Sequence, residues 1–134
     1  MTGRTDGVAP HMTDRPVLQP SATHPITVTP TGKHVTVRVN GEVVADTTDA
    51  VTLQESTYAA VQYVPLADVV PTALQRSDTT SYCPFKGDAS YYHVTAGGDT
   101  VEDVIWTYEQ PYAAVADIAG RVAFYPDKAE VVIG

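Results

Sequence analysis

A thiol and an amine stand close together in residues 79–92, TTSYCPFKGDASYY. Cys83 is the only cysteine of the chain, and Lys86 follows it by three positions, just before Gly87. A cation or base next to a cysteine lowers the pKa of the thiol and activates it as a nucleophile. Unpaired cysteines are nevertheless more often inert core residues. We therefore predict a tight turn here. Cys83 is a candidate nucleophile, and the more common alternative is that it packs beneath the turn as a core residue.

Lys86 and Glu55 are the other charged candidates. Gly87 allows positive φ at the turn, which would deliver Lys86 to a pocket. There the amine could bind a carboxylate or phosphate, or form an imine in a dry site. Glu55 ends the apolar run VTLQE, where a carboxylate facing a cavity would serve as general acid or base. The alternatives are an ordinary surface lysine and a solvated glutamate.

Tyrosine and tryptophan are the most suggestive residue types. Eight tyrosines and one tryptophan accompany only two phenylalanines, and such side chains combine an apolar face with a polar group, as ligand pockets require. We predict ligand contacts from Tyr63, Tyr91, Trp106 and Tyr125, and proton transfer from Tyr108. Trp106 and Tyr108, two residues apart, would share one face of a strand. The alternative is a tyrosine-rich core.

No metal site or cofactor is predicted. His34 and His93 fall in predicted strands without a second histidine or cysteine at ligand spacing, and His11 and His24 lie in or at the end of an N-terminal leader. The common phosphate-binding, dinucleotide, zinc-protease and serine-hydrolase motifs are missing from the sequence.

The elements that position these residues are expected to be mainly strands. Residues 35–39, VTVRV, alternate with the period of a half-buried strand. Asn40-Gly41 is the pair that a two-residue hairpin turn prefers, so residues 42–47 should form the returning strand.

Further strands and short helical pieces are expected downstream. Extended segments are predicted over residues 50–55, 58–65, 90–96, 100–109, 121–126 and 129–134. The AGGD loop and the Asp127-Lys128 turn should each join a hairpin. Residues 65–77 and 110–120 should form short helical turns, limited by Pro71 and ended by Gly120.

Composition bounds the class of protein. With 134 residues the chain can bury a core without disulfides. We predict a disordered leader over residues 1–23 and one β domain over 24–134, built as an antiparallel barrel or two sheets. The net charge of −8 disfavours nucleic acid. Without a signal peptide or membrane-length apolar run, a cytoplasmic protein is expected that does not engage membranes.

Four segments resemble one bacterial family. YVPLADV, TSYCPFKGDASYY, IWTYEQP and GRVAFYPD, in this order between about residues 26 and 133, are similar to the family called domain of unknown function 427. In the family's usual CPYKG segment a tyrosine stands where this chain has Phe85. The resemblance implies a compact, mostly β domain whose matching residues, Glu55, Cys83 and Lys86 among them, converge on one pocket. Some classifications attach a nucleotidyltransferase label, although Glu102-Asp103 do not form the carboxylate cluster such enzymes need.

Three functions follow as expectations. The first is an aromatic pocket for a small polar metabolite, with acid–base chemistry by Glu55 or a tyrosine and with Lys86 steering an anion. The second is a non-catalytic binding module or a homodimer that pairs β edges. The third is nucleotide binding or transfer, as the family label suggests.

Overall fold

The computed structural model describes residues 15–134 and is mainly β, as predicted. Its strands form two antiparallel sheets that do not close into a barrel, so the two-sheet alternative is the one observed. The larger sheet has the order β1-β4-β5-β9-β8-β7-β6 and the smaller has the order β10-β2-β3. The predicted leader falls largely on residues 1–14, which lie outside the described residues.

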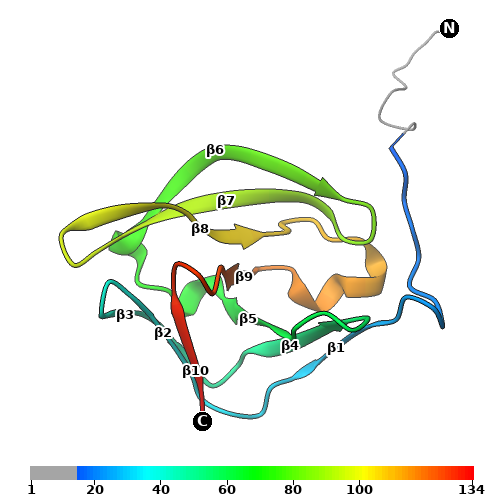
Figure 1. The fold of residues 1–134 in the computed structure, drawn as a ribbon, viewed down its shortest axis with the longest axis horizontal. Helices are drawn as coiled ribbons and strands as arrows, with labels where there is room; N and C mark the ends of the chain where they lie inside the picture. Colours follow the sequence, from blue (N-terminus) through cyan, green and yellow to red (C-terminus); the bar gives the residue numbers. More distant parts are fainter. Residues whose placement is uncertain (1–14) are drawn as a thin grey trace, which may run out of the picture.

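The seven-stranded sheet carries the site. Its strands, in sheet order, are β1 (Ile26–Pro30), β4 (Val51–Glu55), β5 (Val61–Pro65), β9 (Arg121–Phe124), β8 (Asp99–Thr107), β7 (Gly87–Ala96) and β6 (Leu74–Cys83). In Figure 1 the long strands β6 and β7 arch over one side of the molecule, while β1 and β4 lie on the opposite side. The 3-10 helix η3 (Ala113–Ile118) contacts β1 between them.

Both faces of this sheet are buried at its central strands. Successive residues of a strand point to opposite faces: Val64 of β5 and Val122 of β9 enter one hydrophobic cluster, whereas Tyr63 and Ala123 enter a second. The small sheet, with β2 (Val35–Val39), β3 (Glu42–Thr47) and β10 (Glu130–Ile133), supplies valines to the first cluster. Helix η3 supplies residues to the second, which is the cluster around the site.

The first predicted hairpin is confirmed. Strands β2 and β3 pair from Val39–Glu42 outward, and Asn40 and Gly41 have φ values of 51° and 80°. Both values fit a type I′ turn, which needs positive φ at its two central residues. The predicted pair around AGGD is also confirmed, as β7 and β8.

The last predicted hairpin is wrong. Residues 121–124 and 130–133 are strands, but β9 pairs with β5 and β8, whereas β10 pairs with β2. β9 lies between β5 and β8 in the larger sheet, so β10 is not its neighbour. The chain therefore crosses from one sheet to the other at this reversal.

The helical predictions hold in part. Residues 65–77 contain two short 3-10 turns, η1 (Leu66–Asp68) and η2 (Pro71–Ala73), and then enter strand β6 at Leu74. Pro71 begins η2. Helix η3 falls within 110–120 and is followed by Gly120 at φ 73°. Within residues 15–134, every helical segment is too short or too polar to cross a bilayer.

Candidate functional site

The segment CPFKG is the tight turn between β6 and β7, as predicted. Cys83 pairs with Gly87 across the ladder, and the backbone N–H of Lys86 donates to the Cys83 carbonyl at 3.1 Å. Gly87 has φ 109°, well beyond the left-handed region that other residues tolerate. The Lys86 carbonyl accepts from the N–H of Tyr112 at 3.0 Å, which ties the turn to the segment before η3.

Gly87→Ala is expected to lower the unfolding free energy by about 1–3 kcal/mol, because a side chain would be held at a strained φ. Urea denaturation measures the change. Gly32→Ala is the matched control: its φ is 71° and a Cβ there meets no atom within 4 Å. The control should lose less, because φ 71° lies in the left-handed region. An equal loss would show that φ 109° at residue 87 adds no strain beyond that of an ordinary left-handed residue.

Lys86 reaches across the curved sheet to Glu55. Its Nζ lies 2.5 Å from Oε1 of Glu55, which ends β4, and 3.8 Å from Sγ of Cys83. The side chains of Lys86 and Glu55 are only 9% and 15% exposed. The structure therefore joins an amine from the β6–β7 turn to a carboxylate from a strand near the other edge of the sheet.

His24 completes this cluster and was missed by the sequence analysis. Its Nε2 lies 2.8 Å from Oε2 of Glu55, and its ring stacks on Phe85 at 4.2 Å between centroids. Residues 15–25 hold it there by running past the β6–β7 turn, where Leu18 N–H donates to Pro84 O at 2.9 Å. A histidine in a polar segment with no apolar periodicity gives no sequence signal of this contact.

Two donors keep Glu55 ionised. Burial pulls the pKa of Glu55 upward, but the hydrogen bonds from Lys86 and His24 outweigh burial, so its pKa lies below the ordinary value of 4.5. The carboxylate is then the prevailing form at neutral pH. It is available as a proton acceptor.

The lowered pKa has a consequence for acid stability. A depressed carboxylate pKa stabilises the fold above the unfolded pKa, and that contribution is lost as pH falls through the folded value. The advantage of the wild type over Glu55→Gln should therefore shrink between about pH 6 and about pH 3. Urea denaturation across this range measures it. Glu130→Gln, at an exposed strand position, should show no such trend; a pH-independent gap for Glu55→Gln would contradict the assigned pKa.

Aromatic side chains surround the pair. A cavity of about 240 Å³, here called the aromatic cavity, is lined by all the predicted site residues except Cys83. These are Glu55, Tyr63, Lys86, Tyr91, Trp106, Tyr108 and Tyr125. Leu53, Tyr58, Ala59 and Val61 also line it and were not predicted. Cys83 is half-buried and packs against the second core cluster, beneath the turn.

Trp106 organises the wall of the cavity. Its indole N–H donates to the hydroxyl of Tyr63 at 3.1 Å, and its ring lies 4.5 Å from that of Tyr125. Tyr91 is its partner across β7 and β8, and the Tyr91 hydroxyl bonds Ser81 at 2.7 Å. The tryptophan is thus fixed on several sides and gives the cavity a rigid apolar surface.

The phenols stay protonated. Burial raises the pKa of Tyr63 and of Tyr108 far above the ordinary value, and burial beside Tyr91 raises the pKa of Tyr125 to about 12. The Tyr108 hydroxyl makes no hydrogen bond to any of residues 15–134. Its hydroxyl can therefore donate to a bound molecule.

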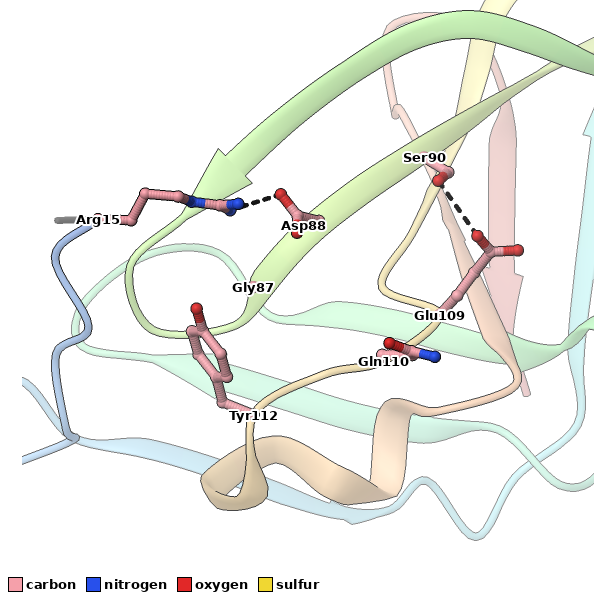
Figure 2. Close-up of a pocket in the computed structure, with 7 residues that line it drawn as sticks. All are labelled: Arg15, Gly87, Asp88, Ser90, Glu109, Gln110 and Tyr112. Atoms are coloured by element: carbon pink, nitrogen blue, oxygen red, sulfur yellow. Dashed lines mark hydrogen bonds and ion pairs between the residues drawn. The ribbon is translucent and has the colours of Figure 1, made fainter. Parts of the chain in front are cut away.

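A second hollow adjoins the same turn through Gly87 (Figure 2). It has a volume of about 390 Å³, but its charged groups are already paired. Arg15 points to Asp88 at 2.5 Å, and Glu109 accepts from Ser90. Glu109 also accepts from the two terminal guanidinium nitrogens of Arg76. Asp88 and Glu109 are 71% and 51% exposed. The charged groups of this hollow are exposed to solvent, whereas the aromatic cavity holds the largely buried pair of Lys86 and Glu55.

Metal ligation has no basis in the described part of the chain. Across residues 15–134, His, Cys, Asp and Glu side chains do not gather in threes at metal-binding distance. Of the described residues that line the aromatic cavity, Glu55 is the one acid, and each of its oxygens already has one hydrogen-bond partner, Lys86 at Oε1 and His24 at Oε2.

Fold and site together define a mainly β, two-sheet domain with a buried amine–carboxylate pair in an aromatic cavity. Residues 27–134 match the family described as a domain of unknown function, DUF427, whose label is that of a nucleotidyltransferase. The chain belongs to this family, which confirms the resemblance found in the sequence. A comparison with curated proteins gave no match.

Proposed function

We propose that the aromatic cavity binds a small polar metabolite and that the Lys86–Glu55 pair performs acid–base chemistry on it. The observation that carries this proposal is the 2.5 Å contact between Lys86 Nζ and Glu55 Oε1, at the wall of a cavity otherwise formed by aromatic and aliphatic side chains. Desolvated titratable groups in a cleft are typical of functional sites.

The N–H donors of Lys86 indicate which polar group the ligand carries. An ammonium has three N–H donors. One is used by Glu55 and one is directed at the weak acceptor Cys83 Sγ. The third has no partner among residues 15–134 and can bind a carbonyl or carboxylate oxygen of the ligand, and Tyr108 can donate to the same molecule. A carbonyl-bearing metabolite is the chemical class that this set of donors favours.

Proton transfer would then fall to Glu55. As a carboxylate it can take a proton from a carbon next to the carbonyl, while Lys86 stabilises the negative charge that develops on the oxygen. His24, bonded to the other carboxylate oxygen, keeps Glu55 oriented during the transfer. No group other than these side chains is required.

The polar groups of the aromatic cavity argue against nucleotidyl transfer. Nucleotidyl transfer uses a cluster of carboxylates to hold Mg²⁺ around a triphosphate. Among residues 15–134 the cavity has one acid, Glu55, and it is already paired with Lys86 and His24. A small metabolite therefore fits the site better than the family label does.

A ligand screen with a kinetic readout tests the proposal. Small oxo acids, ketones and hydroxy acids are screened by thermal shift against the wild type, Lys86→Met and the exposed-lysine control Lys33→Met. A compound that stabilises the wild type and Lys33→Met but not Lys86→Met supports the site.

Proton exchange then separates an enzyme from a binding module. Hits are incubated in deuterated buffer and followed by proton NMR at the carbon next to the carbonyl. Wild-type protein should catalyse exchange, and Glu55→Gln should bind without doing so. Binding without exchange in the wild type would favour the non-catalytic alternative, and a screen with no hit would overturn the proposed site.

A further inference from the structure

Strands β5 and β9 are paired over only part of their length. β5 begins at Val61 and β9 runs to Phe124, yet the ladder joins only Val64 to Val122 and Pro65 to Arg121. The start of β5 and the end of β9 therefore face each other without ladder hydrogen bonds. The sheet has a local opening at this place.

Two cavities meet at this opening. The aromatic cavity lies on one side, and an outer groove of about 300 Å³ extends from it toward β10. Both are lined by Ala59, Val61 and Trp106. The shared residues make the outer groove a continuation of the aromatic cavity rather than a separate surface feature.

The outer groove is apolar. Phe124, Val131 and Ile133 line it beyond the shared residues. Its one amide side chain, Gln62, bonds Thr31 at 2.6 Å and Thr52 at 3.0 Å, so its polar atoms are already satisfied. Ile133 is 47% exposed, which leaves apolar surface that a ligand could cover.

We infer that the ligand carries an aliphatic tail that leaves the aromatic cavity between β5 and β9 and lies in the outer groove. This inference rests on the proposed function, because the polar head of the same molecule is the group bound by Lys86. The aromatic cavity and the outer groove together reach the volume range typical of ligand pockets. The small side chains of Ala59 and Ala60 leave room for a chain along the groove.

A homologous series measures the tail directly. Straight-chain carboxylates from butanoate to decanoate, and methyl ketones of matched length, are titrated against the protein by calorimetry. Each added methylene that enters the groove should tighten binding about fourfold, until the groove is full. The head group stays constant within each series, so the slope reports only the tail.

Neighbouring residues of β10 provide a matched pair of variants. Ile133→Asp places a charge in the groove, whereas Val132→Asp changes the adjacent, similarly exposed residue, which does not line it. Ile133→Asp should weaken the longest members by roughly tenfold or more through loss of apolar contact. Val132→Asp should bind like the wild type.

The outcomes separate this inference from the proposed function. Short members that bind through Lys86 with no gain from chain length would overturn the tail and leave the head site standing. Long members that bind equally well to Lys86→Met would show a groove without a head site, which contradicts both. Binding by no member of either series would also overturn both.

Discussion

Lys86→Met is expected to lower the free energy of unfolding by about 3 kcal/mol, because it leaves Glu55 largely buried without its ammonium partner. The remaining bond from His24 and the residual exposure of Glu55 place the loss at the lower end of the range for a broken buried pair. Chemical denaturation followed by circular dichroism measures it. Lys33→Met, at an exposed position, should change stability little.

A double-mutant cycle shows whether the loss belongs to the pair. Glu55→Gln combined with Lys86→Met removes both charges, so the double variant should be more stable than the sum of the two single losses implies. Additive losses would mean that Lys86 and Glu55 stabilise the fold independently. That result would contradict the contact on which the site is built.

Trp106→Ala is expected to cost about 3 kcal/mol, in the range measured for large-to-small changes at aromatic positions. The side chain lines both the aromatic cavity and the outer groove, and it contacts both Tyr63 and Tyr125. Its removal enlarges both hollows and leaves the Tyr63 hydroxyl without its donor. Denaturation curves from circular dichroism give the loss.

Trp106→Phe separates the contribution of the aromatic ring from that of the hydrogen bond to Tyr63. Phenylalanine keeps a ring against Tyr125 but cannot donate to Tyr63, so a loss of about 1 kcal/mol is expected from the missing hydrogen bond. If the phenylalanine variant loses as much as the alanine variant, the hydrogen bond rather than the ring supports the wall. If the alanine variant loses nothing, Trp106 does not hold the cavity together.

Local sequence patterns predicted the hairpins and turns that depend on residues close together along the chain. The valine alternation and Asn40-Gly41 specify the first hairpin, because strand period and turn chemistry are both encoded within a few residues. CPFKG specifies a turn for the same reason, since Pro84 fixes its own φ and Gly87 permits the positive φ that the turn needs. The gathering of Glu55, Lys86 and the aromatic residues in one place was expected only through the family resemblance.

What the sequence could not reveal depends on contacts across the fold. His24 becomes part of the site because residues 15–25 pass the β6–β7 turn, an arrangement without a local signature. The pairing of β10 with β2 instead of β9 joins strands that lie far apart along the chain. The opening between β5 and β9 follows from a ladder that ends early, and no residue type in the sequence indicates where the ladder ends.

The most direct test of the central claim uses the single tryptophan of the chain. Trp106 lines the aromatic cavity, so a molecule bound there should change its fluorescence. A carbonyl compound found by the thermal screen is titrated into the wild type and into Lys86→Met. We expect a saturable change for the wild type and a roughly ten- to hundredfold weaker affinity for the variant, as for a lost charged hydrogen bond. Equal titration curves for the two proteins would contradict a ligand site built on Lys86.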